Sequence, residues 1–397
     1  MTIAVLIYMA LGALIFWSYC GYLISLLVLS AFEPKEDRAG EVLRFPTFVL
    51  LVPCYNEEAL VGAKFRNLAE LDYPKDRMRI LFLDGGSVDA TRQLINDRIA
   101  GHPHMELVET GTRGKTPQIN AVLPSLTAEI VVCTDMDAEL SRNVLRDFAR
   151  AFEADGTIGV VGAKVIPRTN SLLETQYWED QNVIRLLESE VHSSSIVIAP
   201  CYAFRRGLID AFPEDCVADD IFISFLANVK GFKVKYLPGT EVYETRTPDT
   251  LPHLISHKFR KGNAYMREVL RFLRWVSRMP RRWKLIYITK VLQVVVMPWV
   301  LIVFGIATVA LSLGRRSRPR VVGLVFVFLL VSLAATSLLM ARKRRRMVNR
   351  NHRRSLMVVF LLTNFILFLN ALTYPFYRQT SRFEKIAPRR GPGGRRP

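Results

Sequence analysis

Residues 129–137, EIVVCTDMD, carry the pattern from which the fold can be inferred. An apolar run of strand length ends at two carboxylates, Asp135 and Asp137. Two like charges after a buried strand repel each other unless a cation lies between them, and oxygen ligands favour Mg²⁺ or Mn²⁺. Asp-x-Asp is expected about once by chance in a chain of this length. Its position at a strand end, where α/β sheets bind ligands, favours a metal site.

The chain around this stretch alternates between short apolar runs and amphipathic segments. The predicted strands are residues 47–52, 79–83, 106–108 and 129–134, and the predicted helices are residues 59–71, 89–100 and 115–126. Such alternation indicates an α/β domain with a mainly parallel sheet that has helices on both faces. Ligands bind such sheets at the carboxyl ends of the strands.

Polar motifs follow other predicted strands as well. Tyr55 and Glu57, in the motif PCYNEE that starts at Pro53, suit a base and a ribose, and a helix cap is the structural alternative. Asp84, in LDGGSVD, offers an acceptor to a nucleoside, although the glycines equally suit a tight turn. Lys115, in GTRGK at a predicted helix start, suits a diphosphate or a solvated loop.

Two further carboxylates, Asp219 and Asp220, open an apolar helical run that continues to Phe225. One of them could serve as a general base, and capping of the helix N-terminus is the alternative. Because the motifs fall at successive strand ends, their combination is more specific than any single one. Together they predict one pocket for a nucleotide, its diphosphate and a metal ion.

Long apolar stretches flank this domain. Residues 3–31 carry no charge and can span a hydrocarbon core of roughly 30 Å, and no signal-peptide pattern surrounds them. Apolar stretches at 287–313, 321–340 and 356–377 predict further spans. The pattern divides the chain into a membrane helix (1–32), a catalytic domain (33–249), amphipathic interface helices (250–284), about three membrane helices (285–378) and a basic disordered tail (379–397).

The net charge of +18 is concentrated beside the apolar stretches, at residues 315–320 and 343–354 and in the tail. Such clusters contact anionic lipid headgroups and fix topology, so we expect no nucleic-acid partner. A cytoplasmic domain with four spans would leave 315–320 and the tail outside, which the positive-inside rule disfavours. An interfacial or re-entrant C-terminal segment would remove this conflict. The five cysteines show no metal or redox spacing.

In these motifs and their order, residues 46–261 resemble family 2 glycosyltransferases of the GT-A fold. The membrane-bound members are the most similar, such as hyaluronan, cellulose and chitin synthases and ceramide glucosyltransferase. The resemblance implies a Rossmann-like domain that moves a sugar, with inversion, from a nucleotide sugar (a UDP-sugar above all) to a lipid or glycan acceptor at the cell membrane. A processive polysaccharide synthase is the alternative enzyme, and a transporter or a basic membrane scaffold is the alternative outside enzymes.

The resemblance also implies roles for individual residues. The nucleotide sugar would contact Pro53, Tyr55, Glu57, Asp84, Lys115, Asp135 and Arg260, the metal Asp135 and Asp137, and the acceptor the segment with Cys201, Tyr202 and Arg205. Asp220 aligns with the catalytic base of a Thr-Glu-Asp motif, with Asp219 beside it. Gly85 replaces a common Asp, and His257 and Lys261 replace the Gln and Trp of a Gln-x-x-Arg-Trp motif that is associated with processive synthesis. These departures favour single transfers to a lipid-type acceptor.

Overall fold

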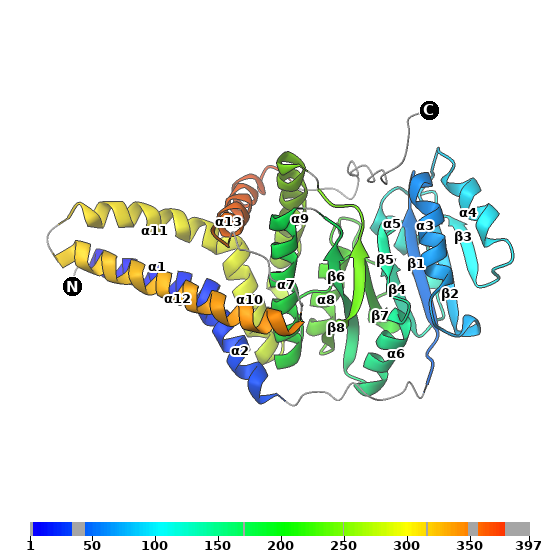
Figure 1. Ribbon diagram of the computed structural model, residues 1–397, viewed down its shortest axis with the longest axis horizontal. Helices are drawn as coiled ribbons and strands as arrows, with labels where there is room; N and C mark the ends of the chain where they lie inside the picture. The colour runs from blue at the N-terminus through cyan, green and yellow to red at the C-terminus, as the bar shows by residue number, and fades with distance from the viewer. Residues whose placement is uncertain are drawn as a thin grey trace.

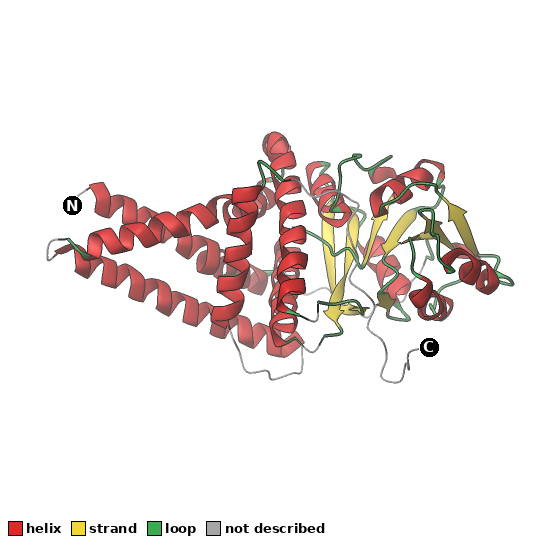
Figure 2. Cartoon of the chain, turned by 90° about the horizontal axis from the view of Figure 1, so that it is seen from above, coloured by secondary structure: helices red, strands yellow, loops and turns green. Residues whose placement is uncertain are grey.

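The computed structural model describes residues 3–33, 44–169, 171–248, 250–314, 317–347 and 356–377. An α/β domain forms one end of the molecule, and long helices project from it at the other (Figure 1). The view from above shows the same division, with all strands at one end and helices alone at the other (Figure 2). The predicted fold class, an α/β domain joined to long apolar helices, is confirmed.

The N-terminal half of the sheet is parallel. It consists of β1 (Phe48–Cys54), β2 (Met78–Asp84), β3 (Met105–Glu109) and β4 (Ile130–Thr134), in the spatial order β3-β2-β1-β4. The connecting helices are α3 (Glu58–Ala69), α4 (Thr91–Ile99) and α5 (Lys115–Val122). These elements match the strands and helices predicted from the sequence. Because all four strands run the same way, their carboxyl ends meet at one edge of the sheet.

The second half of the sheet is mixed, and its strands were not predicted. β7 (Cys201–Arg205) pairs antiparallel with β4 and with β6 (Ile158–Pro167), and β8 (Lys233–Glu244) is parallel to β6 and antiparallel to β5 (Ala138–Leu140). The whole sheet therefore has eight strands in the order β3-β2-β1-β4-β7-β6-β8-β5. Helices α6 (Val144–Ala154), α7 (Leu172–Val191) and α8 (Asp219–Val229) connect these strands.

The core on one face of the sheet extends into the membrane-side helices. This cluster includes Tyr22 and Leu26 of α2 (Tyr22–Phe32) together with Trp283 and Tyr287 of α10 (Arg281–Val291). Trp283 and Tyr287 are fully buried, and their rings stack 5.5 Å apart. Burial of large aromatic side chains is a major stabilising term, so the helices and the α/β domain share one core.

Three helical segments are long and apolar enough to cross a membrane: Ile3–Phe32, Arg281–Ser312 and Pro319–Lys343. The first consists of α1 (Ile3–Phe16), a π-helical turn at Trp17–Gly21 and α2. The second consists of α10, a π-helical turn at Leu292–Val296 and α11 (Met297–Ser312), and the third lies in α12 (Ser317–Met347). In Figure 1, α1, α11 and α12 extend together away from the sheet.

The last predicted span behaves differently. It forms the apolar helix α13 (Leu356–Thr373), in which the described stretch Leu362–Thr373 is shorter than the other three segments. The helix lies against the interface helix α9 (Leu251–Arg271), where Asn263 Nδ2 donates to the Tyr377 carbonyl at 3.1 Å and the Phe259 ring lies 6.2 Å from the Tyr377 ring. The number of C-terminal spans stays a prediction. The basic tail and residues 348–355 lie outside the described residues.

Candidate active site

One cavity of about 1590 Å³ contains most of the residues singled out in the sequence. Its lining includes Pro53, Tyr55, Glu57, Lys115, Asp135, Asp137, Asp219, Asp220 and Arg260. These residues come from β1, α5, α8, α9 and the loop after β4, across more than half of the chain. The structure thus brings the predicted motifs together at the carboxyl edge of the parallel strands, as the strand-end argument requires.

Asp135 and Asp137 lie directly after β4. Burial, followed by the charge of Asp135, raises the pKa of Asp137 to about 7. Two partly buried carboxylates at such close quarters repel each other and attract cations. Lys115 Nζ lies 2.9 Å from Asp135 Oδ1, and Arg246 Nε lies 3.7 Å from Asp137 Oδ2, so each carboxylate faces a protein cation.

Lys115 connects the two acidic motifs. Its ammonium lies 2.9 Å from Asp135 and 3.1 Å from Asp219, and it donates to the Ala199 carbonyl at 3.2 Å. Burial by itself would lower the pKa of Lys115, but Asp135 and Asp219 raise it well above its ordinary value. The lysine is therefore a fixed positive charge between the end of β4 and the start of α8.

Asp219 and Asp220 occupy the first turn of α8 but have different surroundings. Asp219 is buried, accepts a hydrogen bond from the Tyr202 hydroxyl and pairs with Lys115. Asp220 Oδ2 accepts from the Ala199 N–H at 2.9 Å. Burial, followed by the charge of Asp219, raises the pKa of Asp220 to about 6. Asp220 is thus the carboxylate of this pair whose proton affinity is tuned towards neutral pH, which general bases need.

The loops after β1 and β2 are fastened to each other. Asn56 has a left-handed backbone (φ 50°), its N–H donates to Ser87 Oγ at 2.9 Å, and its side-chain oxygen accepts from the Val88 N–H at 2.9 Å. Asn tolerates this conformation better than most residues. The Glu57 N–H donates to Thr91 Oγ1 at 2.7 Å. These bonds fix the loop that carries Tyr55 and Glu57.

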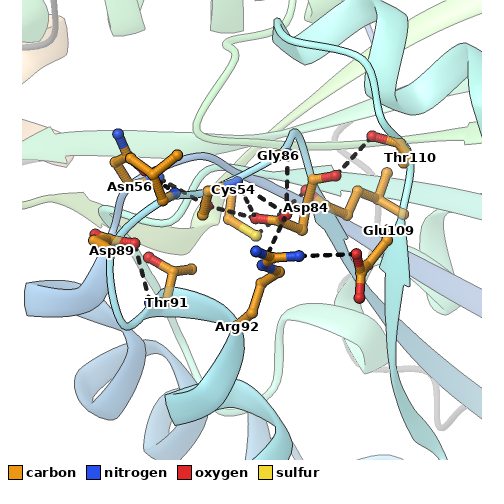
Figure 3. A network of polar contacts seen from close by, with 12 residues as sticks. Cys54, Asn56, Asp84, Gly86, Asp89, Thr91, Arg92, Glu109 and Thr110 are labelled. Atoms are coloured by element: carbon orange, nitrogen blue, oxygen red, sulfur yellow. Dashed lines mark hydrogen bonds and ion pairs between the residues drawn. The ribbon is translucent and has the colours of Figure 1, made fainter.

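Asp84 is placed differently from the other predicted nucleotide contacts. It is fully buried, and its carboxylate accepts from the N–H groups of Gly86 and Ser87, each at 3.0 Å, as Figure 3 shows around the labelled Asp84. Arg92 Nε lies 3.9 Å from the same carboxylate. Asp84 does not belong to the cavity lining, among the residues that the structure describes. Its local contacts shape the turn after β2, and a nucleotide contact stays a prediction.

Gly85, which replaces a common family Asp, has a steric explanation. A Cβ at this position would lie 3.0 Å from the Thr112 carbonyl oxygen and would overlap the Gln118 amide. That amide donates to the Cys54 carbonyl at 2.8 Å. The space of the missing side chain is therefore filled by Gln118 from α5.

The predicted acceptor segment lines little of the cavity. Cys201 and Tyr202 are fully buried in β7, and neither they nor Arg205 belong to the described cavity lining. Tyr202 instead positions Asp219, whereas Arg205 donates to the carbonyls of Phe152 and Ile158 at 3.0 and 2.7 Å. Their acceptor role stays a prediction, with Tyr202 connected to the cavity through Asp219.

Arg246 is a cavity residue that the sequence analysis missed. It forms an ion pair with Glu57 and lies 3.7 Å from Asp137, so it links the predicted ribose and metal positions. Burial by itself would lower the pKa of this guanidinium. The carboxylates of Glu57 and Asp137 outweigh burial, so the pKa of Arg246 is raised overall. Arg246 follows β8 by two residues. A search of every strand end would have found it, had β8 been predicted.

α9 contributes a basic wall. Arg260 and Lys261 line the cavity, and Lys258 lies 2.9 Å from Glu174 and 3.4 Å from the centre of the Tyr177 ring. Burial, followed by the positive charge of Lys261, Arg260 and Lys258, lowers the pKa of His257 far below its ordinary value. His257 is therefore neutral, and the positive charge of this wall resides on the lysines and Arg260.

Part of this chain is similar in sequence to known proteins. Residues 49–213 match the family described as Glycosyl transferase family 2. A beta-monoglucosyldiacylglycerol synthase of Synechocystis sp. is 24% identical over 298 residues, 70% of this chain and 61% of the relative. An N-acetylglucosaminyltransferase of Rhizobium sp. is 26% identical over 269 residues, 62% of this chain and 58% of the relative. The chain spans about three fifths of the length of these curated relatives.

The fold has a solved counterpart. The mannosyltransferase PcManGT from Pyrobaculum calidifontis, solved with GDP-Man and Mn²⁺, superposes with a TM-score of 0.71 at 24% identity, covering 94% of this chain and 99% of the other. Sheet, cavity and apolar helices together define a GT-A domain joined to membrane-type helices. Residues 49–213 are therefore similar to glycosyltransferase family 2, and the relatives of this chain are enzymes of the hexosyltransferase type.

Proposed function

We propose that this protein is an inverting glycosyltransferase that moves a sugar from a nucleotide sugar to a hydroxyl group at a membrane surface. One observation carries the proposal: Tyr55, the Asp135–Asp137 pair, Asp220 and Arg260 line a single cavity. Such a cavity offers, side by side, a stacking ring, a place for a cation, a base and a positive charge. The match of residues 49–213 to glycosyltransferase family 2 supports the same reaction class.

The proposed cofactor is Mg²⁺ or Mn²⁺, held by Asp137 and Asp135. Two carboxylates after β4 fit this role, because such ions use one or two protein carboxylates and take their other ligands from phosphate oxygens and water. Burial and the charge of Asp135 raise the pKa of Asp137, and a bound cation would favour its ionised form. The described part of the chain has no group of three or more His, Cys, Asp or Glu side chains that could hold a metal ion by itself. When bound, the ion would neutralise diphosphate charge.

In the proposed reaction, Asp220 accepts the proton of the acceptor hydroxyl as the acceptor oxygen bonds to the anomeric carbon. The bond between that carbon and the diphosphate oxygen breaks in the same displacement, and the electron pair leaves with the nucleoside diphosphate. Arg260 would stabilise the developing negative charge. Base catalysis of this kind typically contributes a factor of about 10² to 10⁴. Tyr55 and Glu57 would bind the base and ribose of a donor that we take to be a UDP-sugar.

The proposed location is the cell membrane, with the α/β domain in the cytoplasm, where nucleotide sugars are available. Three spans would then place Lys343 and the segment after it on the cytoplasmic side, as the positive-inside rule prefers. α13 against α9 would return the tail to the same side. This arrangement removes one of the two conflicts that four spans create, and residues 315–320 remain outside.

The test is release of nucleoside diphosphate by the purified full chain from UDP-glucose, UDP-N-acetylglucosamine and GDP-mannose, with Mn²⁺ or with a chelator. We expect release with one donor and its loss on chelation. Asp137→Asn should abolish the dependence of donor binding on Mn²⁺, whereas Asp97→Asn on the exposed side of α4 should not. Donor binding that ignores Mn²⁺, or no release with any nucleotide sugar, would reject the proposal.

A further inference from the structure

The cavity does not end at the proposed reaction centre. Beyond Asp220 it is lined by Tyr22 and Leu23 of α2, by Gln293 and Val294 of the second π-helical turn, and by Ile366 of α13. These residues belong to, or lie beside, the segments that are long and apolar enough to cross a membrane. One continuous space therefore joins the nucleotide end to the membrane-side helices.

Two π-helical turns lie at the membrane end of this space. They cover Trp17–Gly21 and Leu292–Val296, and the chain changes direction at both (Figure 1). Gln293 Nε2 donates to the Ser18 carbonyl at 2.6 Å, and Trp17 Nε1 donates to Thr289 Oγ1 at 3.2 Å. π-helical turns inside α-helices are frequent at functional sites. Here they form a polar rim where the apolar part of the cavity begins.

The helices close immediately past this rim. Tyr8, Ile15, Met297 and Phe304 form one buried cluster between α1 and α11, and the rings of Tyr8 and Phe304 stack 4.6 Å apart. None of the residues before Ser18 or between Val294 and Ser312 lines the cavity, within the part of the chain that the structure describes. Among the described residues, this cavity thus ends at the rim and does not continue between α1 and α11 as a conduit for a polymer.

Arg185 of α7 lies in the wall of the same space. It is 5% exposed, and its Nε and Nη1 atoms have no hydrogen-bond partner among the described residues. The Trp178 ring lies 5.6 Å from this guanidinium, but a buried guanidinium without an anion is still expensive, because its charge has left water. The neighbouring Glu188 does not supply that anion, since it pairs with Lys290 at 2.8 Å and accepts from Tyr22 and from the Ser195 N–H.

We propose that the membrane arm of the cavity binds the acceptor as an amphiphilic lipid that carries a phosphate group, with the phosphate on Arg185. Its hydrocarbon chain would leave past Leu23, Val294 and Ile366, and its reacting hydroxyl would face Asp220. Guanidinium groups match phosphate oxygens in shape and charge, and the unpartnered Nε and Nη1 atoms leave Arg185 with unused donors. A free glycan has no hydrocarbon chain that could occupy the apolar arm. This inference rests on the proposed function and specifies its acceptor.

The charges around the arm support an anionic rather than a neutral headgroup. Lys290 is balanced by Glu188 at 2.8 Å, and Lys258 by Glu174 at 2.9 Å, which leaves the positive charge of Arg185 for the ligand. Two classes of lipid carry such a phosphate group: phosphodiesters such as phosphatidylglycerol, and lipid-linked sugar diphosphates. Both present a hydroxyl beyond the phosphate, and the test below separates them.

The first experiment varies the phosphate site. Transfer by the full chain is measured in phosphatidylcholine vesicles that contain phosphatidylglycerol, a polyprenyl-diphosphate sugar or neutral dioleoylglycerol, and in solution with a free oligosaccharide. We expect transfer to a phosphate-bearing lipid, and Arg185→Met should raise KM for it by about 10- to 100-fold, the equivalent of one charged hydrogen-bonding group. Arg185→Lys should restore part of the lost affinity for this lipid, and the exposed Arg66→Met should leave its KM unchanged.

The second experiment blocks the apolar arm. Val294→Trp fills the cavity, whereas Val296→Trp, on the exposed side of the same turn, is the matched control. We expect Val294→Trp to lower lipid glycosylation by about tenfold or more, because the larger side chain overpacks the arm. Hydrolysis of the sugar donor, in which water accepts the sugar, should stay unchanged. Retained hydrolysis shows that the variants fold.

The outcomes separate the two proposals. Wild-type preference for dioleoylglycerol or for the free oligosaccharide, or an unchanged lipid KM in Arg185→Met, overturns the phosphate site. Full lipid glycosylation by Val294→Trp overturns the apolar arm. Absence of donor turnover in the wild-type protein would instead reject the proposed function, because donor hydrolysis needs no acceptor lipid.

Discussion

The two ends of the cavity are built in opposite ways. At the nucleotide end, the loops after the neighbouring strands β1 and β2 are held to each other by hydrogen bonds, as in the bonds of Asn56 to Ser87 and Val88. At the membrane end, residues from distant parts of the chain hold the wall, as in the bonds of Glu188 in α7 to Tyr22 in α2 and Lys290 in α10.

This difference should make donor binding and acceptor use depend on different parts of the molecule. Loops that are bonded to each other at neighbouring strand ends give a preformed nucleotide site with little dependence on the membrane-side helices. Long-range ion pairs make the acceptor end depend on how the membrane-side helices are docked. A change in the bundle should therefore reach acceptor use before donor binding, and the predictions below test that separation.

The largest effect is expected at the boundary between the ends. Asp220→Asn keeps the size of the side chain but removes the carboxylate that would accept a proton. We expect transfer to fall by about 10²- to 10⁴-fold with donor affinity unchanged, measured as product formation and donor binding on one preparation. Asp210→Asn, at a fully exposed carboxylate, is the control. Near-normal transfer by Asp220→Asn would remove Asp220 from the mechanism.

The pH dependence of transfer tests the same residue. A base must be ionised to act, and the pKa of Asp220 is raised to about 6 by burial and by Asp219. Transfer should therefore be constant above this pH and fall about tenfold per unit below it. Rates are measured at saturating Mn²⁺, so that metal binding does not limit them. A profile that stays flat down to the ordinary range of an aspartate would contradict this assignment.

The parallel half of the fold could be predicted because its information is local. Each of β1 to β4 is an apolar run that ends in a polar motif, so the approximate limits of these strands and of α3 to α5 could be read from the sequence. Position at a strand end also sufficed to place Tyr55, Lys115 and Asp137 on one cavity. Nothing beyond strand direction was needed.

The remaining part could not be predicted because its partners are distant. Arg246 pairs with Glu57 across a sequence separation of 189 residues, and no local sequence pattern predicts a contact between residues so far apart. Arg185 lies in a long amphipathic helix, where a charged residue normally faces water, and only the packing of α7 shows that it is buried. Asp84 illustrates the opposite problem: its motif is local, but the carboxylate is used by its own turn.

Glu188→Gln should break the long-range junction. The substitution is nearly isosteric, but it leaves Lys290 buried without its partner at 2.8 Å. Removing one member of a buried ion pair costs about 3–5 kcal/mol of stability. We expect a clear loss of thermal stability in detergent. The double variant Glu188→Gln/Lys290→Met should recover much of it, because no lone charge remains.

Glu190→Gln is the matched control for this junction. Glu190 lies on the same helix and pairs with Lys343 at 2.8 Å, but both side chains are partly exposed. Exposed ion pairs contribute about 0–1 kcal/mol, so this variant should unfold close to the wild-type temperature. Equal losses for Glu188→Gln and Glu190→Gln would show that burial does not distinguish the two pairs, and the contrast between the ends of the cavity would lose its energetic basis.

The smallest expected effect lies at the nucleotide end, at Gly85. An alanine there must displace the Gln118 amide and break its 2.8 Å bond to the Cys54 carbonyl, which lies just before the loop with Tyr55. Loss of one such buried bond costs about 1–3 kcal/mol. Because the damage is local, donor affinity should weaken while the KM for the acceptor stays unchanged. Gly156→Ala, where a Cβ meets no atom within 4 Å, should alter neither. An acceptor defect in Gly85→Ala would show that the two ends are coupled after all.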